Sequence, residues 1–146
     1  MNMHPTINKI IAVIAGVAIG VMLMNAIQTF SPFQPPPGVD YTSGDPPYLQ
    51  WVRALPDKAW MIVLGSMLAG SLLGGFVTNK ITPPANFPPL ITGFVILFFG
   101  IVRYLAFASP AWMTYAACIG CLAFAWAGGW LSPRVRLKNT FGFENK

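Results

Sequence analysis

The sequence predicts an all-α integral membrane protein, built as a bundle of four transmembrane helices, on three observations. Charged residues make up only 9% of the 146 residues, against about 25% in a soluble domain. Hydrophobic residues make up 55%, and the mean hydropathy is +0.59. Four long stretches carry no formally charged side chain. This composition excludes a soluble domain, and the nine Lys and Arg are too dispersed for a nucleic-acid surface.

The charge-free stretches contain four apolar segments of the length that a bilayer requires. The segments cover residues 10–30, 59–77, 89–107 and 111–131. A spanning helix needs about 20 mostly apolar residues, whereas a spanning strand needs about 9–11 and alternates in polarity. A helix also satisfies its own backbone hydrogen bonds in lipid. We therefore predict one membrane domain over residues 1–146, with an outer loop at 31–56 and a tail at 132–146.

The distribution of basic residues predicts the orientation. The side that holds both termini and the second connection carries six of them: Lys9, Lys80, Arg134, Arg136, Lys138 and Lys146. The other side carries three, Arg53, Lys58 and Arg103, together with three aspartates. Because Lys and Arg concentrate on the cytoplasmic side, we expect both termini in the cytoplasm.

The outer loop contains a predicted short amphipathic helix. Asp45 is its expected N-cap, and Tyr48, Trp51, Val52 and Leu55 then recur at i, i+3, i+4 and i+7. One apolar face results, as in a helix that lies in the membrane interface. One interpretation makes this helix a lid or a docking surface for a partner, and the other makes it an anchor between the first two spans.

The second and fourth spans share a pattern that suggests two repeated helical hairpins. The Ala-Trp-Met segment at 59–61 recurs at 111–113, and the Gly-Gly pair at 74–75 recurs at 128–129. The alternative is chance similarity between membrane helices.

Small residues at four-residue intervals mark predicted contact faces of the helices. Such residues let helix backbones approach closely where lipid supplies no hydrophobic driving force. The faces are expected to pack within the chain or, alternatively, against another subunit. Together with two residues near the outer surface, the candidate partner or lipid contacts are Gly16, Gly20, Ser66, Gly70, Gly74, Trp51 and Arg103.

Three polar side chains lie near the outer ends of the predicted spans. Arg103 lies about a turn from the end of the third span, where it could extend to the interface. Alternatively, it could bind an anionic lipid headgroup or a partner's carboxylate. Asn25 and Gln28, near the end of the first span, could hydrogen-bond a neighbouring helix or a ligand.

Cys118 and Cys121 form a CxxC motif. Thiol–disulfide exchange favours a first Cys at a helix N-terminus, where its thiolate is stabilised, but this motif lies about two turns inside the fourth span. The vitamin K epoxide reductase fold also has a CxxC in its fourth span, but the paired loop cysteines of that family are absent here. We expect both to be buried packing residues. His4 lies at the opposite end of the sequence from the two cysteines, and a metal site would need further ligands. No metal or cofactor is therefore expected.

The run PTINKIIAVIAG at 5–16, followed by PPPGVD at 35–40, resembles a family of small bacterial inner-membrane proteins. In that family a PPP-x-GVD-like loop follows the first of four spans. The resemblance covers most of the chain and implies a bacterial inner-membrane location without supplying catalytic residues.

These observations favour a non-enzymatic accessory or scaffold subunit of a larger membrane complex. Its partners would be membrane lipid and other integral subunits, or further copies of the chain, and not nucleic acid. The alternative is a small transporter or a lipid- or quinone-binding protein that acts as an oligomer. A third hypothesis, a membrane thiol oxidoreductase, depends on the CxxC motif alone.

The orientation can be tested by labelling cysteines in a background that carries Cys118→Ser and Cys121→Ser. A cysteine introduced by Ser43→Cys should react with a membrane-impermeant thiol reagent in intact cells, because its loop is outside. A cysteine introduced by Thr140→Cys should react only after the membrane has been opened. The opposite labelling pattern would overturn the orientation.

Overall fold

The computed structural model describes residues 5–34, 36–38, 46–82, 87–105 and 109–132. These residues form an all-helical fold and contain no strand, as the sequence predicts. The elements are α1 (Pro5–Thr29), α2 (Pro46–Arg53), α3 (Asp57–Ile81), α4 (Phe87–Gly100), the π-helix η1 (Ile101–Leu105) and α5 (Ala111–Leu131). Helices α1, α3 and α5 are long and apolar enough to cross a membrane, and the helical segment Phe87–Arg103 is apolar but shorter.

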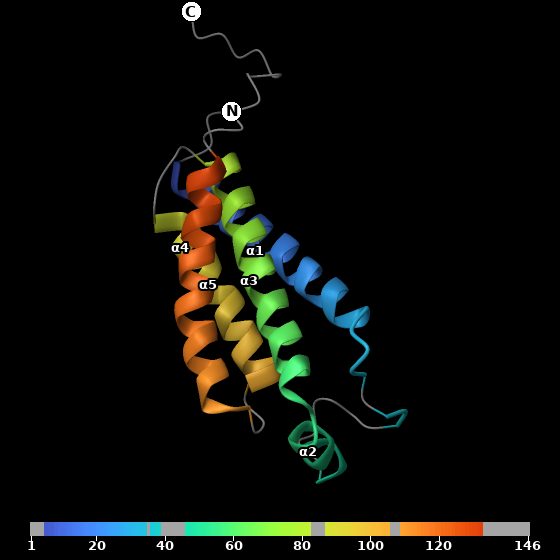
Figure 1. The fold of residues 1–146 in the computed structure, drawn as a ribbon. Helices are drawn as coiled ribbons and strands as arrows, with labels where there is room; N and C mark the ends of the chain where they lie inside the picture. Colours follow the sequence, from blue (N-terminus) through green and yellow to red (C-terminus); the bar gives the residue numbers. More distant parts are fainter. Residues whose placement is uncertain (1–4, 35, 39–45, 83–86, 106–108, 133–146) are drawn as a thin grey trace, which may run out of the picture.

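Helices α1, α3, α4 and α5 form the bundle, and α2 lies at one end of it (Figure 1). Helix α3 is central and packs against α1, α4 and α5. Gly16 lies against Gly74 and Gly20 against Gly70, so α1 is antiparallel to α3. Gly120 lies against Leu68, whereas Asn79 bonds Gly129, so α5 runs parallel to α3.

The helix bounds match the predicted spans closely at α5 and less closely elsewhere. Helix α1 begins at Pro5, before the predicted 10–30 segment, and α3 continues to Ile81, beyond the predicted end at 77. Side-chain hydrogen bonds hold the extra turn of α3: Thr78 Oγ1 lies 2.7 Å from Thr92 Oγ1, and Asn79 Nδ2 donates to the Gly129 carbonyl at 2.7 Å.

Prolines mark the start of α4 and α5. Pro88 and Pro89 lie in the first turn of α4, where a missing N–H is tolerated, and Pro110 is the N-cap of α5. The predicted third span, 89–107, is not one α-helix: after Gly100 it continues as η1, and residues 106–108 lie outside the described part. A π-turn takes up an extra residue and so changes the direction of the side chains that follow.

The closest helix contact joins α1 and α3 through glycines. A Cβ atom added at Gly70 would lie 2.7 Å from the Gly20 carbonyl oxygen, and one added at Gly74 would lie 2.8 Å from the Gly16 carbonyl oxygen. These distances are too short for any side chain, so the two backbones are in contact. These four glycines therefore pack against one another within the chain. Of the two alternatives for these faces, packing within the chain or against another subunit, the structure has the first.

A second close contact joins α3 and α5. A Cβ at Gly75 would overlap the Ala125 carbonyl oxygen, and one at Gly128 would overlap that of Leu72. One glycine of each Gly-Gly pair in the suggested repeat therefore packs against the helix that carries the other pair. The Ala-Trp-Met segments differ: Trp60 is 5% exposed and Trp112 is 43% exposed, so matching positions have different surroundings.

The glycine contact predicts a strong effect of Gly70→Leu, with Gly65→Leu as the matched control on the same helix. A side chain at Gly70 would overlap the Gly20 backbone, whereas a Cβ at Gly65 would meet nothing within 4 Å. We expect Gly70→Leu to lower the free energy of unfolding by about 1–3 kcal/mol or more. Gly65→Leu should be neutral or slightly stabilising, because Leu favours helix over Gly.

Thermal unfolding in detergent measures both variants. Equal melting temperatures for Gly70→Leu and the unmodified chain would show that α1 does not cross α3 at these glycines.

Candidate functional site

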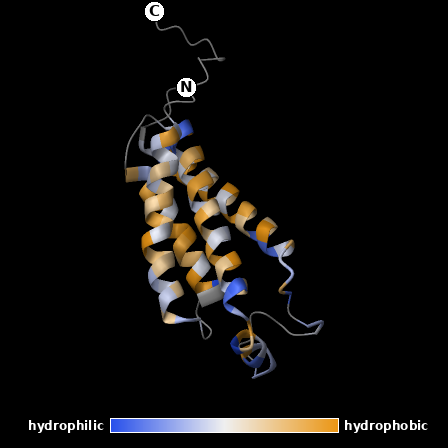
Figure 2. Cartoon of the chain, viewed as in Figure 1, coloured by the Kyte–Doolittle hydropathy of each residue, from blue (hydrophilic) through white to orange (hydrophobic). Residues whose placement is uncertain are grey.

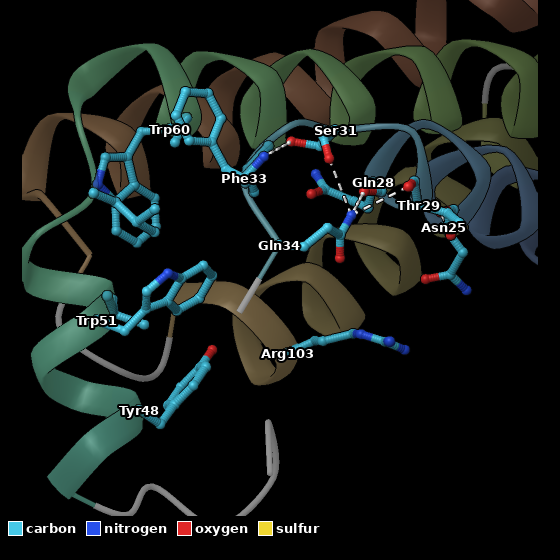
Figure 3. Close-up of a pocket in the computed structure, with 14 residues that line it drawn as sticks. Asn25, Gln28, Thr29, Ser31, Phe33, Gln34, Tyr48, Trp51, Trp60 and Arg103 are labelled. Carbon is cyan, nitrogen blue, oxygen red and sulfur yellow. Dashed lines mark hydrogen bonds between the residues drawn. The ribbon is translucent and has the colours of Figure 1, made fainter. Parts of the chain in front are cut away.

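A pocket of about 180 Å³ lies between the end of α1, the residues that follow it, α2, the start of α3 and η1. Polar, aromatic and aliphatic side chains all line it (Figure 3). The polar ones are Asn25, Gln28, Thr29, Ser31, Gln34 and Arg103; the aromatic ones are Phe33, Tyr48, Trp51 and Trp60; the aliphatic ones are Val52, Leu55, Ala59 and Val63.

The end of α1 is capped by a side chain that comes after it. The last carbonyls of a helix lack intrahelical partners, and Gln34 Nε2 donates to the carbonyl oxygens of Gln28, Thr29 and Ser31 at 2.8, 3.2 and 3.2 Å. The Ser31 hydroxyl in turn accepts the Phe33 N–H at 3.3 Å. This cap turns the chain back at the end of α1, so that Phe33 and Gln34 contribute to the pocket wall.

A polar bridge joins α1 to α3 beside the pocket. Gln28 Nε2 donates to the Ser66 hydroxyl at 2.7 Å, and that hydroxyl donates to the Val63 carbonyl at 2.7 Å. Gln28 therefore makes one of the contacts expected of it, a hydrogen bond to a neighbouring helix. Nearer the middle of the two helices, glycines bring the backbones of α1 and α3 into contact. Beside the pocket, the long side chain of Gln28 bridges the two helices instead. The wider gap between α1 and α3 at this level leaves room for the pocket.

Helix α2 forms another wall. The short amphipathic helix expected in the outer loop is present, and its expected N-cap Asp45 lies outside the described residues. Tyr48 and Val52 are buried, 5% and 3% exposed, within the chain's own hydrophobic core. The rings of Tyr48 and Trp51 lie 5.9 Å apart at 37°. The apolar face of α2 thus packs on the bundle and covers this end of it.

The opposite wall carries the groups that can recognise a polar ligand. Figure 3 shows Tyr48, Trp51 and Trp60 on one side, with Asn25 and Arg103 on the other. The Asn25 Oδ1 atom is buried and has no hydrogen-bond partner in the described structure. Leaving a buried polar atom unsatisfied costs about 1–3 kcal/mol, and such atoms are uncommon in folded proteins.

Arg103 supplies the only formal charge among the fourteen lining residues. It belongs to η1 and its side chain is exposed. Single π-turns within helices occur frequently at functional sites. A guanidinium group offers several fixed donors that match a carboxylate or phosphate. The pocket therefore combines a cation, an unsatisfied acceptor and an aromatic wall.

The pocket is equipped for binding. Its side chains are amides, hydroxyls, aromatic rings and one guanidinium, which recognise a ligand by hydrogen bonding, charge and packing. Within the described ranges, no group of three or more His, Cys, Asp and Glu could hold a metal ion. The CxxC motif lies elsewhere, in α5, where Cys121 is fully buried and Cys118 is partly buried.

Two of the seven candidate contacts, Trp51 and Arg103, meet in the pocket. Ser66 lies beside it through its bond to Gln28. The four glycines lie in the contact between α1 and α3 instead. The sequence analysis did not identify Trp60 and Gln34 as residues of the site. For Gln34 the one available signal was that an amide residue follows shortly after a predicted helix end.

Comparison of the chain with protein-family models, with curated proteins and with solved structures finds no match.

Proposed function

We propose that this chain is a four-span integral membrane protein that binds an amphipathic small molecule, without catalysing a reaction, in the pocket at the outer end of its bundle. The observation that carries the proposal is a pocket of about 180 Å³ in which amide and hydroxyl groups and Arg103 lie together with four aromatic side chains. A bacterial inner-membrane location with cytoplasmic termini is part of the proposal.

The outer surface of the bundle supports a membrane setting. Large apolar side chains point outward from every bundle helix, among them Ile14 (62% exposed), Met61 (62%), Phe94 (61%) and Ile119 (73%). A soluble monomer rarely exposes extensive apolar patches. Figure 2 shows hydrophobic residues along the length of the bundle helices and hydrophilic ones gathered at their ends and on α2.

The course of the chain supports a fourth crossing. Helices α3 and α5 run parallel, so the segment between them has to return to the end where α3 begins. That segment comprises α4, of 14 residues, and η1, of five. Its length is roughly 28 Å at a helical rise of about 1.5 Å per residue, close to the hydrocarbon thickness of about 30 Å.

The size and place of the pocket favour part of an amphipathic molecule as the ligand. Sites for drug-sized ligands measure about 300–1,000 Å³, so about 180 Å³ suits a headgroup or one ring with its tail outside. The pocket lies where α1 ends and α3 begins, which is the expected level of the membrane interface. A molecule that enters from the lipid could place its polar part against Asn25 and Arg103.

The accessory-subunit hypothesis remains the second candidate. The glycines that suggested a partner face are occupied within the chain, but α5 presents exposed aromatic residues, Tyr115 at 72%, Trp126 at 49% and Trp130 at 53%. A subunit would copurify from native membranes with fixed partners in a constant ratio. The thiol oxidoreductase hypothesis has little support, since Cys121 is 0% exposed.

Native mass spectrometry of the chain released from nanodiscs of bacterial lipid tests the binding function. We expect one retained amphipathic molecule per chain. Val63→Trp should abolish its retention, because Val63 lines the pocket and the larger ring fills it. Val77→Trp is the matched control, the same change on the same helix outside the pocket lining, and should leave retention unchanged.

A chain that retains no amphipathic molecule would overturn the proposal. So would equal retention in the two Trp variants, because lipid would then be held on the outer surface alone.

A further inference from the structure

We infer that α2 is a lid on the pocket, which swings away from the bundle about residues 54–56 to admit and release the bound molecule. This inference rests on the proposed binding function and concerns the regulation of the same site. It follows from three features of α2: its place over the pocket, its attachment by side chains, and its amphipathic character.

Helix α2 and the residue two positions beyond it form one wall of the pocket. That wall consists of Tyr48, Trp51, Val52 and Leu55, which share the apolar face of the helix. Every other lining residue belongs to α1, the segment that follows α1, α3 or η1. Movement of α2 away from the bundle would therefore remove one whole wall and open the pocket, while the other walls stay in place.

Side chains, rather than close packing of backbones, attach α2 to the bundle. Among the described elements, the closely packed pairs all lie within the set α1, α3, α4, η1 and α5. Tyr48 and Val52 are buried in the hydrophobic core, and Trp51 and Leu55 pack against it. Elements of low local contact density open at a lower free energy than the whole fold, and ligand-binding lids are drawn from them. An eight-residue helix attached in this way fits that description.

A short link allows α2 to move without disturbing α3. The Ala54 N–H donates to the Gln50 carbonyl at 3.1 Å and the Leu55 N–H to the Val52 carbonyl at 3.2 Å, so both residues are bonded back to α2. Pro56 is extended, with φ −70° and ψ 158°, and precedes α3 without a side-chain cap. Within the described chain, no backbone hydrogen bond crosses from Leu55 to Pro56. Residues at the ends of elements commonly serve as hinges.

The amphipathic character of α2 keeps an open position accessible at a membrane surface. Tyr48 and Val52 face the bundle, whereas Gln50 and Arg53 are exposed. In water, undocking would expose the apolar face at a large free-energy cost. At the membrane interface the same face can enter the boundary between headgroups and acyl chains. Undocking then exchanges one apolar environment for another, at the level where a molecule from the lipid reaches the pocket.

Distances between two spin labels test the movement, in a background that carries Cys118→Ser and Cys121→Ser. One label pair joins Gln50→Cys on α2 to Phe30→Cys, directly after α1, where Phe30 is 87% exposed. The control pair joins Phe30→Cys to Met61→Cys on α3, where Met61 is 62% exposed. Pulsed electron paramagnetic resonance in nanodiscs measures both distances: the first changes when α2 swings out, and the second reports on the bundle.

Val52→Gln should release the lid, because it places an amide where Val52 is 3% exposed in the apolar core. We expect a second distance for the α2 label pair, with the open population raised about tenfold or more, and an unchanged control pair. Arg53→Gln introduces the same side chain at the adjacent exposed position and should change neither distance. Val52→Thr, which keeps the shape of Val and adds a hydroxyl, should act in the same direction with a smaller effect.

Release of the bound molecule tests whether the lid controls access. Protein that has retained a molecule from bacterial lipid is mixed with an excess of vesicles of deuterated phosphatidylethanolamine and phosphatidylglycerol. Native mass spectrometry then follows the loss of the molecule that each chain originally held. Val52→Gln should lose it about tenfold faster than the unmodified chain, and Arg53→Gln should lose it at the unmodified rate.

The outcomes distinguish failure of the lid from failure of the binding function. An unchanged α2 distance in Val52→Gln would overturn the lid, and so would a control pair that shifts in both Val52→Gln and Val52→Thr, because α2 would then be part of the bundle. Equal rates of loss in Val52→Gln and Arg53→Gln would overturn control of access and leave the binding function standing. A chain that retains no molecule would overturn the binding function, whereas the label distances would still decide whether α2 moves.

Discussion

The contact of α1 with α3 through backbone glycines is the constraint on which the rest of the structure depends. Gly16 and Gly20 face Gly74 and Gly70 with no room for a Cβ on either side. In the membrane setting proposed for this chain, lipid would give no hydrophobic driving force between helices, so close packing of this kind would supply much of the association. The same contact fixes where the two helices are nearest, and hence where they separate enough to leave a pocket.

The two ends of the bundle differ in how their polar groups are satisfied. At the end where α3 stops, Thr78 Oγ1 lies 2.7 Å from Thr92 Oγ1 and 3.3 Å from the Ala12 carbonyl, and Asn79 bonds the Gly129 carbonyl. Three helices are thereby tied to α3. At the pocket end, Gln28 and Gln34 are bonded, but the Asn25 acceptor is not. A second buried polar atom without a partner in the described structure, Ser71 Oγ, lies in α3 outside the pocket.

Local signals predicted most of the fold. Length and hydropathy located the bundle helices, Pro88 and Pro110 marked where α4 and α5 begin, and α5 has the bounds expected for it. The four-residue spacing of Gly16 and Gly20, and that of Gly70 and Gly74, indicated contact faces that the structure contains, because that spacing defines one stripe of a helix. Whether such a face packs against a partner or within the same chain depends on how two helices that are distant in the sequence cross each other. The spacing of small residues does not determine this crossing.

The candidate site was predictable only in part, for the same reason. Polar residues near a helix end, Asn25, Gln28 and Arg103, were conspicuous in an apolar sequence. Trp60 and Trp112 occupy matching motifs, yet only Trp60 is buried and lines the pocket. Which tryptophan faces inward depends on the rotation of each helix in the bundle. The cap formed by Gln34 depends on a chain reversal that follows α1, and the π-turn at Arg103 carries no recognisable sequence pattern.

A crystal structure of the chain grown from bicelles that contain phosphatidylethanolamine would test the central claim most directly. We expect electron density for the polar part of one amphipathic molecule inside the pocket between α1, α2, α3 and η1. Lipid density confined to the outer apolar faces of the bundle, with the pocket closed by the chain's own side chains, would contradict it.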